Sequence, residues 1–307
     1  MKKHTIFLII LAFFSCDKSK NKLPLERDDN GITLSISLQG SLQNPAFSPD
    51  GKSIIFTRFV KGYNQEPAEI YKFNLETEVL TLMVSGGSGN VNLPGSTWVN
   101  GQIIFSSTRE PHDEIYLISE NGKPGDELKM TNRQDSVAYE PSFSPDGQWA
   151  VFESHKLDEE GNGIITINRL SCTCPYFNLT AKEDDCRQPN WSPRGDKILY
   201  QQKKNNVWNI WMMNIDGTDK VQVTNNLGSC TDASFLEDGQ FIVFSTDFQS
   251  DIANIYKIGI DGNNPTRLTN FKGYDGAVSV FGNTLIFESS DGDPDGSDGT
   301  KLVVVEL

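Results

Sequence analysis

The strongest constraint on the fold is one short stretch, residues 44–58 (NPAFSPDGKSIIFTR), that recurs along the chain. Close variants begin at Glu140 (EPSFSPDGQWAVFES), Gln188 (QPNWSPRGDKILYQQ) and Asp232 (DASFLEDGQFIVFST). In its Ser-Pro-Asp-Gly core, Pro fixes φ at the first central position of a turn, Asp tolerates the second, and Gly adopts the positive φ that reverses the chain. Each copy therefore predicts a tight hairpin between two strands.

The turn glycines divide the chain into six units of similar length. They are Gly51, Gly101, Gly147, Gly195, Gly239 and Gly282. After each turn comes an apolar strand that ends in an aromatic residue, such as IIF at 54–56. Most units continue with an Ile-aromatic pair, such as Ile70-Tyr71, and then a Leu-Thr pair or a near equivalent, such as Leu268-Thr269. These markers predict a third and a fourth strand in each unit.

A single four-stranded unit cannot bury both of its faces, whereas six units packed around an axis can. The sequence therefore predicts an all-β fold, a six-bladed β-propeller of four-stranded antiparallel blades over residues 31–307. The sixth unit has strands near 277–281, 284–288 and 301–306 and lacks a fourth strand. Residues 32–38 (ITLSISL) alternate apolar and polar side chains, so we expect this N-terminal strand to close the last blade.

The aromatic-Ser-Pro-Asp-Gly units, with their IY and LT markers, resemble the WD-like repeats of TolB-type propellers over nearly all of residues 31–307. Three units depart from the pattern, with WVNG, FLEDG and VFGN at the turn, and the additional N-terminal α/β domain of the TolB family has no counterpart in these residues. The resemblance implies a propeller whose channel mouth receives a protein partner.

The first residues have the parts of a bacterial lipoprotein signal. Two lysines precede an apolar run over residues 6–14, which is too short to span a bilayer, and Cys16 follows a small residue. The tetrapeptide FFSC resembles the lipobox, which implies a signal peptide over residues 1–15 and lipidation of Cys16. A plain signal peptide with an incidental cysteine is the alternative. Residues 16–30 are polar and nearly featureless, and we expect them to form a flexible tether.

These features predict a protein of the bacterial cell envelope that is lipid-anchored on the periplasmic face or at the cell surface. The formal net charge of −14 argues against nucleic acid as a partner, because an acidic surface repels a phosphate backbone. Basic peptides, divalent cations and neutral sugars remain compatible with this charge. We expect the protein to be a monomer.

Ligand-binding residues are expected at the channel mouth, just before the aromatic anchor of each first strand, because function on such scaffolds concentrates in loops and concavities. The predicted mouth residues are Asn44, Tyr139, Glu140, Arg187, Gln188, Asp232, Tyr274 and Asp275. The competing interpretation is that these polar side chains only solvate the funnel.

The segment DGDPDGSDG at 291–299 resembles the start of a calcium loop. Its carboxylates at Asp291, Asp293 and Asp295 alternate before a glycine, and Asp298 is a further candidate ligand. Residue 302 is Leu where an EF-hand needs Glu, so a solvated acidic loop is the competing interpretation. Calcium is the one cofactor that the sequence suggests.

Two cysteines, Cys186 and Cys230, occupy the same position in adjacent units. Because export permits disulfides, we predict a bridge between them, with free thiols as the alternative. A zinc site is disfavoured, since only His112 and His155 follow the leader and loop histidines are commonly just solvated.

We therefore predict a non-catalytic envelope lipoprotein whose propeller binds a protein partner or a glycan at the channel mouth. The alternative is a glycan-active enzyme, a polysaccharide lyase or hydrolase, that uses carboxylates at the mouth. The nearest approach to a nucleophile elbow, GGSGN at 86–90, lacks the final glycine, so catalytic residues are not assigned.

Overall fold

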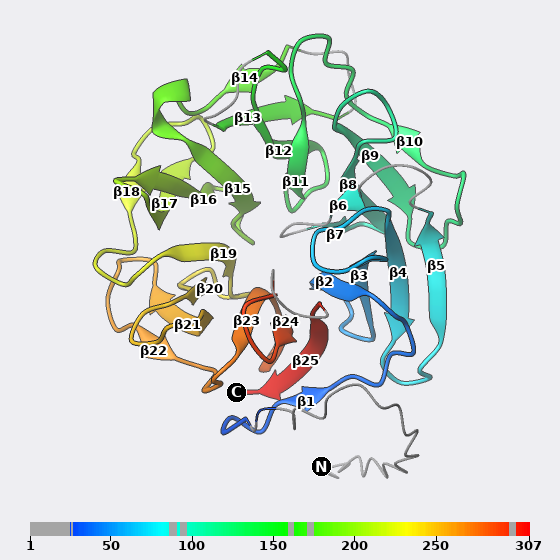
Figure 1. Cartoon of the computed structure of the whole chain (residues 1–307). Coiled ribbons are helices and arrows are strands. Elements are labelled where there is room, and N and C mark those ends of the chain that lie inside the picture. Colours follow the sequence, from blue (N-terminus) through cyan, green and yellow to red (C-terminus); the bar gives the residue numbers. More distant parts are fainter. Residues whose placement is uncertain are drawn as a thin grey trace, which may run out of the picture.

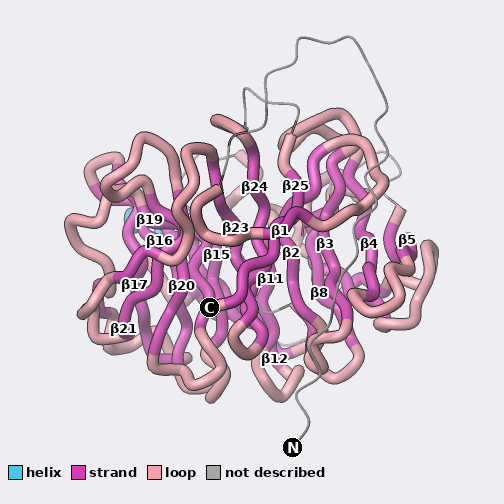
Figure 2. Tube along the Cα trace, turned by 90° about the horizontal axis from the view of Figure 1, so that it is seen from below, coloured by secondary structure: helices cyan, strands magenta, loops and turns pink. Residues whose placement is uncertain are grey.

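The computed structural model describes residues 25, 27–85, 91–92, 97–158, 163–170, 175–294 and 299–307. Six antiparallel sheets surround a central axis, and this confirms the predicted six-bladed propeller (Figure 1). The strands run between two faces of the ring, and loops gather on both (Figure 2). In the described part of the chain the one helical element is a 3-10 turn, Lys182–Asp184, so no helix there is long and apolar enough to cross a bilayer.

The inner strands lie nearest the axis. They are β2 (Ser41–Phe47), β11 (Tyr139–Phe143), β15 (Cys186–Trp191), β19 (Cys230–Phe235) and β23 (Tyr274–Phe281), while blade 2 has two short pieces, β6 (Val91–Asn92) and β7 (Trp98–Val99). The second strands are β3 (Ser53–Phe59), β8 (Gln102–Ser107), β12 (Trp149–Ser154), β16 (Lys197–Lys204), β20 (Phe241–Thr246) and β24 (Thr284–Ser290). The chain enters each inner strand on one face, here called the mouth face, and makes the predicted hairpins on the other, the turn face.

The third strands are β4 (Ala68–Asn74), β9 (Glu114–Ser119), β13 (Ile164–Arg169), β17 (Val207–Asn214), β21 (Asn254–Gly259) and β25 (Lys301–Glu306). The outer strands are β5 (Leu80–Val84), β10 (Leu128–Lys129), β14 (Phe177–Asn178), β18 (Val221–Gln222), β22 (Thr266–Arg267) and β1 (Ile32–Thr33). Most outer strands have two residues, which leaves the propeller only short exposed edges.

The ring closes as predicted, because β1 pairs with β25 through Ile32 opposite Val304 and supplies the fourth strand of blade 6. The paired strand is shorter than residues 32–38, although the Leu34 amide still donates to the Leu302 carbonyl at 2.9 Å. Leu34, Ile36 and Leu38 then pack against the hydrophobic cluster between blades 6 and 1. Closure therefore combines a short strand pairing with apolar burial along the seam.

Each seam between neighbouring blades contains one hydrophobic cluster. Consecutive apolar residues of a second strand point into different seams, as Ile54 and Ile55 do. This explains the unbroken apolar runs in the repeat, because both faces of every blade are buried. The aromatic residue that ends each run is fully buried. These residues are Phe56, Phe105, Phe152, Tyr200, Phe244 and Phe287.

The Leu-Thr and Ile-aromatic markers are explained by one hydrogen bond. The hydroxyl of Thr224 accepts from the backbone N–H of Ile210 at 2.8 Å, just beyond the point where the two-residue strand β18 ends. The same bond, at 2.8 or 2.9 Å, recurs in three other blades, as Thr131 to Ile115, Thr180 to Ile165 and Thr269 to Ile255. A buried threonine therefore continues the ladder where the outer strand has stopped.

The predicted bridge between Cys186 and Cys230 is wrong, because both are buried free thiols. Cys186 lies in the seam between blades 3 and 4, whereas Cys230 lies in the seam between blades 4 and 5. Equivalent positions in adjacent blades are one seam apart, so a shared repeat position does not bring two side chains together. Cys172 and Cys174 lie outside the described residues, as does Cys16.

The predicted tether also needs correction at its end, since residues 27–30 are docked on the propeller. Arg27 pairs with Phe271 in an antiparallel bridge, and its guanidinium makes an ion pair with Asp275 at 2.8 Å. A polar composition predicted a solvated segment, but the charged side chains here bond to the protein rather than to water. Residues 16–24 and 26 lie outside the described part of the chain.

Replacing Thr224 with Val should lower the free energy of unfolding by about 1–3 kcal/mol, because the isosteric change leaves the buried Ile210 N–H without an acceptor. The measurement is urea unfolding monitored by tryptophan fluorescence. Thr266→Val on exposed β22 is the matched control and should change stability by under about 0.5 kcal/mol. Equal stabilities of the two variants would refute the role assigned to this threonine.

Candidate functional site

β-Bulges recur in the inner strands that surround the central axis. In each of the five blades where the structure describes this stretch, the register of the inner strand shifts at one residue with a left-handed backbone. These residues and their φ angles are Asn44 (49°), Glu140 (50°), Gln188 (47°), Asp232 (53°) and Ala277 (46°). Positive φ is rare outside glycine, and bulges re-aim backbone groups and side chains, so this repeated conformation shapes the channel.

The bulge N–H groups connect each blade to the one before it. The N–H of Asn44 donates to Oε2 of Glu288 at 3.1 Å, across the seam between blades 1 and 6. The N–H of Glu140 donates to Oγ of Ser106 at 3.4 Å, and that of Asp232 donates to Oε1 of Gln188 at 3.3 Å. The bulges therefore form inter-blade contacts as well as the channel wall.

A second ring of polar residues lies behind the bulges, and reasoning from the sequence missed it. Each member directly follows the buried aromatic residue of a second strand, and all six are buried. They are Thr57, Ser106, Glu153, Gln201, Ser245 and Glu288. A signal was present, because this position is polar in every repeat although the residues before it are apolar.

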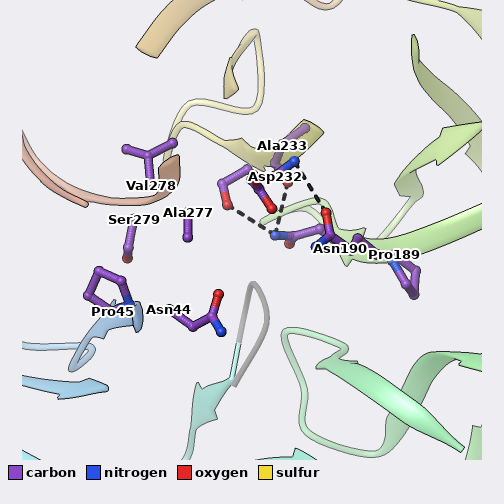
Figure 3. Close-up of a pocket in the computed structure, with 11 residues that line it drawn as sticks. Asn44, Pro45, Pro189, Asn190, Asp232, Ala233, Ala277, Val278 and Ser279 are labelled. Atoms are coloured by element: carbon purple, nitrogen blue, oxygen red, sulfur yellow. Dashed lines mark hydrogen bonds between the residues drawn. The ribbon is translucent and has the colours of Figure 1, made fainter. Parts of the chain in front are cut away.

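Four of the bulge residues line one small cavity. A cavity of about 40 Å³ lies between blades 1, 4, 5 and 6, and it is lined by Asn44, Gln188, Asp232 and Ala277 together with their neighbours. Figure 3 shows Asn44 and Asp232 beside this shared space, with Asn190 linked by hydrogen bonds to blade 5. One water needs roughly 10–15 Å³, so this cavity has room for a few water molecules only.

Carboxyl groups converge near this cavity, and burial changes their protonation. Burial, followed by the nearby negative charge of Asp232, raises the pKa of Glu288 to about 8. The same two causes raise the pKa of Glu140, and burial with the charge of Glu140 raises that of Glu153 well above its usual value. Burial also raises the pKa of Asp232. Near neutral pH the cluster therefore holds protons and can donate as well as accept hydrogen bonds.

Hydrogen bonds connect these carboxyls across the mouth. Nε2 of Gln188 donates to Oε1 of Glu140 at 3.4 Å, and the same side chain accepts from the Asp232 amide. On the other side, the hydroxyls of Tyr274 and Tyr63 donate to Oε1 of Glu288 at 3.2 and 3.4 Å. Asn44, Glu140, Gln188, Asp232 and Tyr274 thus meet at the mouth, and their contact with a ligand stays a prediction.

Arg187 forms the basic part of the mouth. Its Nε lies 3.2 Å from Asp185 and 3.8 Å from Glu153, and its guanidinium lies 5.4 Å from the ring centre of Trp208. Tyr139 lies nearby, and the charge of Glu140, followed by burial, raises its pKa. Arg187 is about one third exposed, so it can contact a ligand while its neighbours hold it in place.

The predicted mouth residue Asp275 requires a correction. Blade 6 has a shorter hairpin than the Ser-Pro-Asp-Gly blades, so its bulge falls at Ala277 rather than two residues earlier. Asp275 consequently faces the interior, is fully buried and is paired with Arg27. It is unavailable to a ligand at the mouth while Arg27 is docked.

The calcium loop and the zinc site receive no support from the described residues. Asp291 and Asp293 are exposed, while Asp295 and Asp298 lie outside the described part of the chain, so the calcium prediction stays untested. Across the ranges that the structure describes, no three His, Cys, Asp or Glu side chains form a metal-binding group. His112 instead contacts the Arg133 carbonyl at 2.8 Å.

The turn face has a different character from the mouth. There the inner strands end around an opening of about 440 Å³ whose one carboxylate is Glu237. Its aromatic lining consists of Phe47, Trp98, Phe143, Trp191, Phe235 and Phe281. The two ends of the channel therefore offer different chemistry, acidic at the mouth and apolar at the turns.

This geometry defines a β-propeller with buried carboxyl groups close to its central axis. A sequence model of the TolB beta propeller domain matches residues 28–206 and 158–296, and the chain belongs to this family. A relative, the Tol-Pal system protein TolB of Francisella tularensis subsp. holarctica (strain OSU18), is 31% identical over 201 residues. That match covers 65% of this chain but only 44% of the relative's length.

Solved structures show the same fold at low identity. TolB from Acinetobacter baumannii superposes with a TM-score of 0.58 and 16% identity, covering 86% of this chain and 63% of that one. An oligogalacturonate lyase in complex with manganese has a TM-score of 0.52 and 12% identity, with 86% and 76% covered. A TolB protein and a lyase therefore share this architecture, and function must be argued from the site.

Glu288 should make stability dependent on pH. Its folded pKa is raised, so its contribution to stability is complete below the unfolded value of 4.5 and is lost as pH rises towards 8. Glu288→Gln should unfold like the parent at pH 4.5 and be more stable by about 2–4 kcal/mol at pH 9. Urea titrations at both values test this, with exposed Glu76→Gln as control. A constant difference between parent and variant across this range would contradict the proposed protonation.

Proposed function

We propose that this chain is a lipid-anchored protein of the bacterial envelope whose propeller binds a partner protein at the channel mouth without catalysing a reaction. The single observation that carries the proposal is the mouth, where bulge residues of several blades meet buried carboxyls beside a cavity of about 40 Å³. Hydrogen-bonding groups from several blades converge there, so a protruding segment of a partner can contact them together.

The chemistry of the mouth suggests what the partner presents. Glu140 and Asp232 are hydrogen-bonded through Gln188, so they favour a donor-rich tip such as a basic side chain or free backbone N–H groups. Arg187, stacked on Trp208, adds a separate point for a carboxylate or carbonyl oxygen. A folded protein supplies both kinds of group at fixed spacing.

Two further facts support an envelope role. The first residues resemble a lipoprotein signal that ends at Cys16, and the relative from Francisella is described as a protein of the Tol-Pal system. The chain spans less than half of that relative, so the partner of this protein has to be found directly.

The test is affinity capture from envelope extracts with the full-length protein, followed by binding measurements on the purified partner. Glu140→Gln with Asp232→Asn should weaken that binding by at least about tenfold, because the two changes replace carboxyl groups that converge at the mouth and alter the hydrogen bonds they offer a partner. Glu76→Gln with Glu78→Gln makes the same kind of change, from carboxyl to amide, at the exposed β4–β5 turn on the other face and should leave affinity unchanged.

Equal affinity of both double variants would contradict a mouth site. The glycan-active alternative is tested in parallel by incubating the protein with envelope polysaccharides and looking for shortened chains. Product formation that is lost in the mouth variant would replace the binding proposal with an enzyme.

A further inference from the structure

We propose that blade 6 carries a guanidinium-binding pocket on the mouth face, filled by Arg27 of this chain and open to an arginine of another protein when the N-terminal segment is withdrawn. Its walls are Asp275, Ser289, Phe271 and Phe287. Phe271 lies in the connection that enters β23, and Ser289 lies near the end of β24, so the pocket is on the side where the inner strands begin.

The contacts of Arg27 use every donor that a guanidinium has. Nη1 and Nη2 each donate to one oxygen of Asp275 at 2.8 Å, and Nη1 also donates to Oγ of Ser289 at 3.0 Å. Nε and Nη2 donate to Asp29 at 2.9 and 2.8 Å. Arginine has five N–H groups in a rigid planar fork, and all five are engaged.

Two aromatic rings complete the pocket. The guanidinium carbon of Arg27 lies 4.4 Å from the ring centre of Phe271 and 5.1 Å from that of Phe287. Both rings are almost completely buried in the propeller. This combination of a bidentate carboxylate, a hydroxyl and aromatic faces selects a planar cation over an ammonium group.

The walls are held in place by groups other than Arg27. Oδ1 of the fully buried Asn254 accepts from the Phe271 amide at 2.9 Å, and its Nδ2 donates to the Phe271 carbonyl at 3.2 Å. The Asp275 amide donates to the Ala253 carbonyl at 2.9 Å, and Phe287 belongs to a seam cluster. The pocket therefore keeps its shape when its occupant is removed.

The repeat does not itself require a carboxylate at this position. Asp275 lies two residues before the bulge of blade 6, and its counterparts in other blades are buried apolar or thiol side chains. These counterparts are Leu42, Ala138, Cys186 and Cys230. A buried carboxylate is costly without a cation, so Asp275 favours a guanidinium in the emptied pocket.

Besides Arg27, the segment is attached through Oδ2 of Asp29, which accepts from the Asn270 amide at 2.8 Å, and through Leu34, Ile36 and Leu38 in the seam between blades 6 and 1. The Asp28 amide donates to the Asn270 carbonyl at 3.2 Å, and two residues of β1 pair with β25. A partner that engages the mouth lies beside the same face. An arginine on that partner can therefore take the place of Arg27, which would give the mouth face a second attachment point.

The experiment is chemical rescue in the full-length protein. Arg27→Ala should melt about 5–10 °C below the parent, because Asp275 loses its partner. Ethylguanidinium chloride at about ten times its dissociation constant, in the millimolar range, should raise the melting temperature of the variant by about 2–4 °C by mass action and leave the parent unchanged.

Three controls decide the outcome. Ethylammonium at the same concentration carries a positive charge but lacks the planar guanidinium group, so it should give no rescue. The double variant Arg27→Ala with Asp275→Asn lacks the carboxylate and should not respond to either compound. Arg27→Lys replaces Arg27→Ala if the latter does not fold. Equal rescue by both cations, no rescue, or a variant as stable as the parent would each overturn the pocket.

Discussion

The fold depends on the hydrogen bond that each bulge N–H donates to a polar side chain of the preceding blade. Apolar seams alone do not fix how far the blades approach one another or the register of the inner strands. The bond from Asn44 to Glu288, and those of Glu140 and Asp232, fix both at the axis. At these residues the left-handed backbone accompanies an N–H that points across the seam, and four of them line the small cavity beside the axis.

The sequence predicted the architecture well because every blade repeats the same local chemistry. Turn residues such as Gly51 have the positive φ that their type suggests, and threonines such as Thr224 coincide with the point where an outer strand ends. Each turn or strand marker is a weak signal alone, but the markers recur at similar spacing in a single sequence, and this repetition makes the predicted architecture specific. The number of blades and the closing role of Ile32 and Thr33 followed from this period.

The site was predicted less completely, for reasons that concern individual residues. The sequence pattern predicted ligand-binding residues at the inner strands only. Glu153 and Glu288 were therefore missed, because they lie on second strands. Asp275 was misplaced because a shorter hairpin shifts the bulge of blade 6 by two residues. Arg27 was missed because it lies before the first repeat unit, so no repeat position indicated its role. Burial and pairing of single charged residues depend on contacts between distant parts of the chain, which periodicity does not encode.

Closure by β1 has a consequence for the order in which the molecule is built. The strand at Ile32 and Thr33 is among the first parts of the domain to be synthesised, and its partner at Lys301–Glu306 is among the last. Until residues 301–306 have been synthesised, β1 has no partner strand, and Leu34, Ile36 and Leu38 can pack only against the blade 1 half of their seam. The last seam is therefore completed only by residues from both ends of the domain, and this late step is when a holding chaperone would be most valuable.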